Sequence, residues 1–166
     1  MSIINYHIFI FEYLRKMNDE FNIFLKNLKE TKILAKKISK FVAKRTFICL
    51  KGELGIGKTT FANFLINELS EKKINVLSPT YSILQIYELK KIKIWHYDLY
   101  RVKNKNEIFF LDFENALNDC VLVEWPEIIN DYCPENRIEL EFYEKKNLEK
   151  NVKIFFYGKK YNKLKF

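Results

Sequence analysis

Residues 52–59, GELGIGKT, fit the pattern G-x-x-x-x-G-K-[ST] of a loop that binds nucleotide phosphates. Glycines let successive backbone N–H groups turn toward an anion, and a helix that follows the loop adds its own free N–H groups. Lys58 is then expected to reach the β- and γ-phosphates, and the Thr59 hydroxyl is expected to face Mg²⁺. The chain has only four glycines, and three of them lie in this octapeptide. A phosphate-binding loop is therefore favoured over an incidental Gly-rich turn.

Two acidic residues that close predicted strands are candidates to complete a nucleotide site. A P-loop enzyme needs a carboxylate beside the phosphates to hold Mg²⁺ or its water. Glu124 closes the apolar run 120–123, the pattern of a buried parallel strand that delivers an acid at its carboxyl end. Asp98 closes a second strand over residues 92–97. The alternatives are a helix-capping or ion-paired role for Glu124 and a turn-forming role for Asp98.

Two residues beside these acids have two interpretations each. His96 lies on the same strand face as Asp98 and is a candidate base, although an isolated histidine on an apolar strand is more often a core residue. Trp125 follows Glu124 and either stacks on a base or a partner, or is an ordinary buried tryptophan.

The sequence at residues 104–107, NKNE, approximates the guanine-reading N-K-x-D motif of GTPases. It ends in Glu instead of Asp and lies in a polar stretch before a helix, not at the end of an apolar strand. The D-x-x-G switch is also missing, because residues 98–101 read DLYR. A GTPase is therefore disfavoured.

The elements that must position these groups form one α/β domain. We expect a single P-loop NTPase-like domain with a mixed, mainly parallel sheet, flanking helices and a β-hairpin. Residues 1–16 are expected to be an N-terminal extension, and residues 17–166 the P-loop ATPase domain. Apolar spacing predicts helices over residues 21–44, 61–69 and 106–118, and strands over residues 46–50, 81–88, 92–99, 120–123, 137–143 and 152–157.

Composition limits the compartment and the partners. The three cysteines have no paired spacing, which favours a reducing compartment over a disulfide framework or a zinc site. No apolar run approaches the about 20 residues of a membrane span, so we expect a cytoplasmic protein without a membrane segment. Of the net charge of +8, residues 144–166 hold eight Lys against two Glu. That segment is either a solvated strand face or a contact with nucleic acid or a partner.

Four blocks, in this order, resemble the TsaE family, small bacterial ATPases of tRNA threonylcarbamoyladenosine biosynthesis. They are residues 52–61 (GELGIGKTTF), 78–81 (SPTY), 96–101 (HYDLYR) and 123–126 (VEWP). The resemblance implies ATP and Mg²⁺ as cofactors, with Thr59 and Glu124 near the metal and Asp98 needed for hydrolysis. Lys58, Asp98 and Glu124 are thus the catalytic candidates. The nucleotide-binding candidates are Gly52, Leu54, Gly55, Ile56, Gly57, Lys58, Thr59 and Thr60.

The resemblance also implies partners. These are the proteins TsaD and TsaB, which transfer threonylcarbamoyl to the adenosine beside the anticodon, while the ATPase resets their complex between turnovers. Residues 145–166 are Lys-rich and lack the family's usual Gly and Arg positions, and they are a candidate tRNA contact.

Two other classes of function compete with this one. A small-molecule or nucleoside kinase would use the same loop, but such kinases usually need an Arg-rich lid, and only Arg101 and Arg137 follow the loop. A basic RNA-binding module with a vestigial P-loop is the third class, and it would bind tRNA in a salt-sensitive manner that ATP does not affect.

Overall fold

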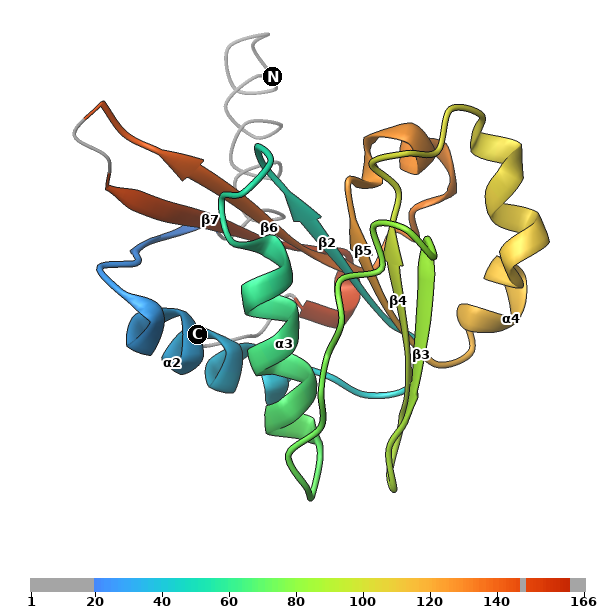
Figure 1. Ribbon diagram of the computed structural model, residues 1–166, viewed down its shortest axis with the longest axis horizontal. Helices are drawn as coiled ribbons and strands as arrows, with labels where there is room; N and C mark the ends of the chain where they lie inside the picture. The colour runs from blue at the N-terminus through green and yellow to red at the C-terminus, as the bar shows by residue number, and fades with distance from the viewer. Residues whose placement is uncertain (1–19, 147–148, 162–166) are drawn as a thin grey trace, which may run out of the picture.

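A seven-stranded sheet with helices on both faces forms the protein (Figure 1). The computed structural model describes residues 20–146 and 149–161, so the expected extension at residues 1–16 lies outside the described residues. The elements in chain order are β1 (Glu20–Phe24), α2 (Leu28–Ser39), β2 (Thr46–Lys51), α3 (Lys58–Leu69), β3 (Leu84–Glu88), β4 (Lys93–Asp98), η1 (Lys105–Leu111), α4 (Phe113–Ala116), β5 (Cys120–Glu124), η2 (Pro126–Tyr132), β6 (Arg137–Glu144), β7 (Lys150–Tyr157) and η3 (Lys159–Tyr161), where η marks a 3₁₀-helix.

The strand order is β1-β7-β6-β2-β5-β4-β3. The four central strands, β6, β2, β5 and β4, are parallel, and antiparallel strands flank them on both sides. This confirms the expected mixed α/β domain, with β3 and β4 as the expected hairpin. Because the central strands are parallel, their carboxyl ends lie at one edge of the sheet, where ligands bind in open α/β folds.

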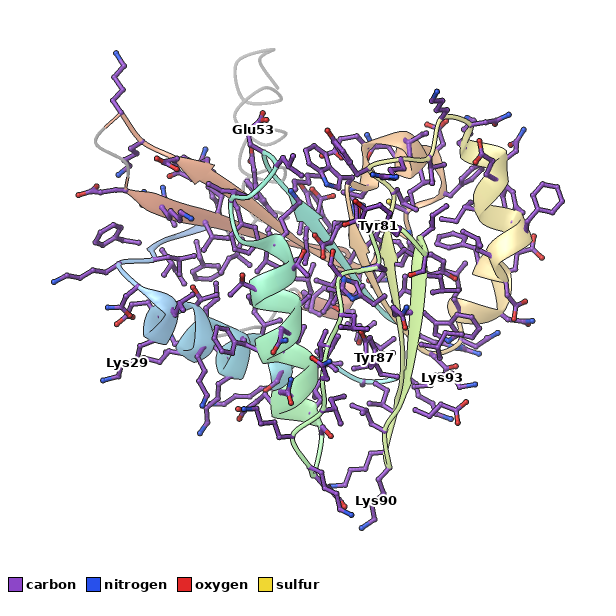
Figure 2. The ribbon with its side chains drawn as sticks, in the orientation of Figure 1. Lys29, Glu53, Tyr81, Tyr87, Lys90 and Lys93 are labelled. Atoms are coloured by element: carbon purple, nitrogen blue, oxygen red, sulfur yellow. The ribbon has the colours of Figure 1, made fainter. Side chains whose placement is uncertain are left out.

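The core consists of two apolar layers, one on each face of the sheet. Alternate residues of β2 divide between them: Ile48 packs in the layer under α2 and α3, whereas Phe47 packs in the layer under η1, α4 and η2. Side chains fill the space between the helices and the sheet (Figure 2). None of the helices within the described residues is long and apolar enough to cross a membrane.

The expected strands at 46–50, 92–99, 120–123, 137–143 and 152–157 are confirmed to within two residues, and α3 begins at Lys58, before the expected helix 61–69. The strand expected from residue 81 begins only at Leu84, because turns occupy residues 79–82.

The helix expected over residues 21–44 is wrong at both ends. Residues 20–24 form β1, an edge strand whose exposure alternates along its length and which pairs with β7. The helix begins at Leu28 because the Asn27 side chain caps it, accepting hydrogen bonds from the backbone N–H groups of Lys29 and Glu30. It ends at Ser39. The apolar spacing over residues 21–28 imitated a helix and concealed a strand.

The helix expected over residues 106–118 is also wrong, because it is broken in two. Asp112 adopts a left-handed conformation with φ 57°, which ends η1 and precedes the short helix α4. The NKNE sequence at residues 104–107 is a capping box at the start of η1. Asn104 accepts from the backbone N–H of Asn106, and Glu107 accepts from that of Asn104. These contacts explain the imperfect guanine-reading motif as a helix start.

Candidate nucleotide-binding site

The phosphate-loop sequence forms the turn between β2 and α3. Gly52 and Gly57 lie near its two ends with φ of 127° and 121°, values that side chains rarely permit. At Gly52 a Cβ atom would also collide with the backbone carbonyl of Phe142 on β6. Glycine is required here by both the backbone conformation and the close approach of the neighbouring strand.

The N-terminus of α3 is suited to an anion. Within this helix, which the structure describes in full, Gly57 offers no side-chain cap and the first turn contains no acidic residue. The free N–H groups of the first turn and the positive end of the helix dipole are therefore available to a ligand.

Lys58 is folded against its own loop. Its Nζ atom donates to the backbone oxygens of Gly52 at 2.5 Å and Glu53 at 2.9 Å, and lies 3.9 Å from the ring centroid of Trp125. Burial lowers the pKa of Lys58, while the negative charges of Glu124 and Asp98 oppose that shift. Two carboxylates thus lie close enough to attract the positive charge of Lys58.

Trp125 lies at the edge of this site instead of deep in the core. The side chain is half-buried, and its ring also packs on Tyr100 with centroids 5.0 Å apart. The backbone at Trp125 is left-handed, with φ 59°.

Asp98 and Glu124 lie side by side, because β4 and β5 are parallel neighbours whose register pairs these two residues. The Thr59 hydroxyl, from the first turn of α3, donates to Glu124 Oε2 at 2.9 Å. The structure therefore brings together Lys58, Thr59 and both acids. Their catalytic and metal-binding roles stay predictions.

Each carboxylate accepts two hydrogen bonds. Asp98 accepts from the Thr80 hydroxyl at 2.5 Å and from the backbone N–H of Tyr100 at 3.1 Å, so it makes a local turn contact as well as facing the loop. Glu124 has His96 as its second partner, with Nε2 3.0 Å from Oε1. From the sequence, Thr80 was identified only as part of the block 78–81 that resembles the family, and the contacts of Thr80 with Asp98 and of His96 with Glu124 were missed.

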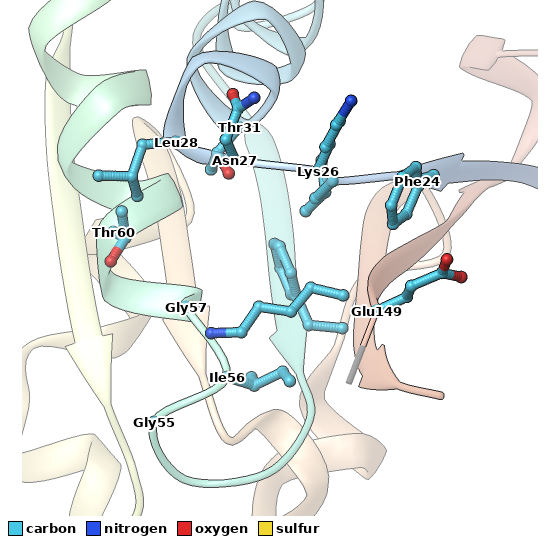
Figure 3. A pocket seen from close by; sticks show the side chains of 13 residues that line it. Phe24, Lys26, Asn27, Leu28, Thr31, Gly55, Ile56, Gly57, Thr60 and Glu149 are labelled. Atoms are coloured by element: carbon cyan, nitrogen blue, oxygen red, sulfur yellow. The ribbon is translucent and has the colours of Figure 1, made fainter. Parts of the chain in front are cut away.

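Among the hollows that adjoin the loop, two share Gly55, Gly57 and Thr60. The smaller, about 170 Å³, lies beside the acids and is lined by Leu54, Gly55, Gly57, Lys58, Thr59, Thr60, Thr80, Asp98, Glu124 and Trp125. The larger, about 430 Å³, shares Gly55, Gly57 and Thr60 and extends to the β1–α2 connection (Figure 3). Ile56 lines the larger hollow, together with Phe24, Asn27, Leu28 and Thr31 among others. This part of the site was not predicted from the sequence, because residues 21–27 were expected to be helical.

The two arginines that follow the loop are engaged elsewhere. Arg101 lies over the ring of the exposed Tyr81, with its guanidinium carbon 4.3 Å from the centroid. Arg137 pairs with Glu139 at 2.6 Å. Among the described residues, neither arginine lines the two hollows.

The C-terminal lysines do not form one patch in the described part of the chain. Lys145 and Lys150 lie at the β6–β7 connection, whereas Lys160 lies beyond the opposite end of β7, with Nζ 3.3 Å from Thr46 Oγ1. Lysines 163 and 165 lie outside the described residues. The tRNA contact through this segment stays a prediction.

Comparisons with known proteins identify the family. A family model described as "Threonylcarbamoyl adenosine biosynthesis protein TsaE" matches residues 25–152. The tRNA threonylcarbamoyladenosine biosynthesis protein TsaE of Rickettsia prowazekii is 40% identical over 131 residues, which cover 78% of this chain and 89% of that protein. TsaE of Bacillus subtilis is 30% identical over 138 residues, covering 83% and 87%.

The fold also matches that of a solved structure. The crystal structure of Bacillus subtilis YdiB superposes with a TM-score of 0.68 at 27% identity, covering 87% of this chain and 90% of that one. The family match includes the loop, both acids and the strands that carry them. This chain belongs to the TsaE family of tRNA threonylcarbamoyladenosine biosynthesis proteins.

Proposed function

We propose that this protein binds ATP with Mg²⁺ and hydrolyses it, as the ATPase subunit that acts on the TsaD–TsaB transferase complex. One observation supports the proposal best. The side chains of Lys58, Thr59, Asp98 and Glu124 lie together at one edge of the sheet. Phosphoryl transfer depends on such positioned charges, and little covalent chemistry is required of the protein.

The residues present fit Mg²⁺. The Thr59 hydroxyl and the Glu124 carboxylate are hard oxygen donors 2.9 Å apart. No group of three or more His, Cys, Asp or Glu side chains in the described part of the chain could hold a metal by itself. This suits Mg²⁺, which proteins usually hold through one or two carboxylates, nucleotide phosphates and waters. When bound, Mg²⁺ neutralises charge on the phosphate oxygens.

The remaining groups divide between binding and hydrolysis. The loop N–H groups and the start of α3 bind the phosphates, and Lys58 exchanges its bonds to Gly52 and Glu53 for bonds to phosphate oxygens. Asp98, held by Thr80 and by the Tyr100 N–H, accepts a hydrogen bond from the attacking water and orients it.

The larger hollow receives the nucleoside. Its volume of about 430 Å³ is ample for a base and a sugar, and it adjoins the loop at Gly57 and Thr60. Figure 3 shows Phe24, Leu28 and Asn27 around this hollow. The apolar side chains can cover the faces of a base, and the polar ones can contact its edge.

Phosphate release from γ-labelled ATP tests the proposal. Wild-type protein with Mg²⁺ is expected to release labelled inorganic phosphate, and the release should rise when TsaD and TsaB of the same source are added. Label that moves to a nucleoside or another small molecule would instead identify a kinase. The positions of Arg101 and Arg137 argue against a kinase, because neither lies over the loop within the described residues.

The partners and the RNA-binding alternative are tested by co-purification. Tagged protein is incubated with TsaD, TsaB and tRNA, with and without ATP. ATP-dependent retention of the two proteins supports the proposal. Retention of tRNA alone, lost at high salt and independent of ATP, supports an RNA-binding module with an inactive loop.

A further inference from the structure

His96 lies inside the sheet, next to the candidate metal site. Its side chain is fully buried on β4, two residues before Asp98, and its Nε2 atom lies 3.0 Å from Glu124 Oε1. It does not line the smaller hollow, so the ring cannot reach a ligand there directly. Any effect of His96 on the site is therefore exerted through the carboxylate that it contacts.

The hydrogen-bond partners fix the position of the ring hydrogen. An ionised carboxylate only accepts, so Nε2 must be the donor to Glu124. The other ring nitrogen, Nδ1, has no hydrogen-bond partner among the residues that the structure describes. Nε2 therefore carries a ring hydrogen.

We propose that His96 is the positioning residue of Glu124. Its Nε2–H group holds Oε1, which leaves Oε2 directed at Thr59, the other residue that would hold the metal. A glutamate side chain has three rotatable bonds, and a bond at each oxygen restricts them before the metal binds. The inference rests on the proposed function in one respect, namely that Thr59 and Glu124 hold the metal.

This role explains why an apolar interior contains a half-satisfied histidine. A residue kept only for packing would leave no polar atom unpaired, because an unpaired buried polar atom costs stability. Within residues 20–146 and 149–161, one nitrogen of His96 has no hydrogen-bond partner and the other contacts a carboxylate of the site. The arrangement matches the outer partners of metal ligands, which orient a ligand without touching the ion.

Metal affinity in two variants tests the proposal. Mn²⁺ binding is followed by electron paramagnetic resonance in the presence of a non-hydrolysable ATP analogue, so the readout does not depend on turnover. His96→Leu removes the donor and is expected to weaken Mn²⁺ binding about 10-fold or more. His96→Gln keeps an N–H donor of similar reach and is expected to restore most of the affinity. Binding of the analogue without metal should be unchanged in both.

Trp95→Phe is the matched control on the same strand. Trp95 Nε1 donates to Asp119 Oδ2 at 3.2 Å. The Trp95 side chain packs in the apolar layer that also contains Phe47, under η1, α4 and η2. The control removes one side-chain hydrogen bond to a carboxylate from β4 but does not touch Glu124. Mn²⁺ affinity should stay at the wild-type value. An equal loss in Trp95→Phe and His96→Leu would show that loosening β4, not losing the donor, causes the effect, and would overturn the proposal.

Nitrogen NMR of the wild-type protein gives a test that does not depend on metal affinity. The chain has two histidines, His7 and His96, so His96→Gln assigns the signals. We expect a hydrogen on Nε2 of His96, and an Nε2 atom without a hydrogen would overturn the proposal. Wild-type Mn²⁺ affinity in His96→Leu would overturn it as well. Failure of the wild-type protein to bind Mn²⁺ with the analogue would instead overturn the proposed function, and the inference with it.

Discussion

Gly52 and Gly57 form a matched pair for testing the phosphate loop. Their φ angles are nearly the same, 127° and 121°, so an alanine at either position suffers similar backbone strain. The space around them differs. A methyl group at Gly52 meets the carbonyl of Phe142, whereas a methyl group at Gly57 meets nothing within 4 Å. The difference between Gly52→Ala and Gly57→Ala therefore isolates the collision with β6.

The magnitude follows from these two contributions. Backbone strain costs both variants about 1–3 kcal/mol. Gly52→Ala must also displace a backbone carbonyl inside the sheet, and overpacking of this kind costs about 1–3 kcal/mol more. For a domain of this size, 1 kcal/mol lowers the melting temperature by about 2–4 °C. Taking the middle of the overpacking range, we expect Gly52→Ala to melt about 4–8 °C below Gly57→Ala.

Thermal unfolding by circular dichroism without nucleotide measures this difference, and nucleotide binding is measured in parallel. Gly57→Ala should keep the higher melting temperature but lose ATP affinity, because Gly57 lines the smaller hollow and directly precedes the helix start that is proposed to bind the phosphates. Equal melting temperatures in the two variants would refute the packing argument. Wild-type ATP binding by Gly57→Ala would refute the placement of the phosphates.

Three other predictions concern the proposed activity. Lys58→Ala should abolish phosphate release and weaken ATP binding, and normal turnover would show that the loop assignment is wrong. The same variant should lower the unfolding free energy in urea by about 1–3 kcal/mol, because two hydrogen bonds from a charged group are lost. Asp98→Asn should bind ATP and hydrolyse it slowly, while Glu124→Gln should need more Mg²⁺, as followed by phosphate release over a Mg²⁺ titration; equal loss of ATP binding in both would contradict this division. The isolated protein should be a slow ATPase that TsaD and TsaB accelerate, because Arg101 and Arg137 lie elsewhere and a missing arginine can cost about 10³–10⁵ in rate; an unchanged rate in a confirmed complex would contradict it.

The placement of the site could be predicted from the sequence because its spacing is set by local rules. The loop motif fixes the order strand, turn and helix, and the apolar run before Glu124 indicates a buried parallel strand. Parallel strands end at the same edge, so Asp98 and Glu124 were expected near the loop. The contacts of Thr80 and His96 could not be predicted in this way, because they depend on side-chain conformations and on which residues face one another across strands.

The edge of the fold was harder to predict than its centre. Residues 20–24 pair with β7, far along the chain, and the alternation of polar and apolar residues over residues 20–23 is too short to separate a strand from the start of a helix. Asn27 was the signal available, since a capping residue there argues against a helix that begins earlier. Because β1 was not predicted, the larger hollow, whose wall includes Phe24 and Leu28, was not predicted either.

Two carboxylates that pair in register on neighbouring strands should repel each other, and the structure offsets this repulsion with donors from several elements. Glu124 accepts hydrogen bonds from Thr59 on α3 and from His96 on β4. Asp98 accepts hydrogen bonds from Thr80, in the loop before β3, and from the backbone N–H of Tyr100, in the loop after β4. Hydrogen bonds to a carboxylate stabilise its charged form. Lys58 adds positive charge nearby, yet its own hydrogen bonds go to the loop carbonyls, so the proposed phosphate contact requires Lys58 to exchange these partners.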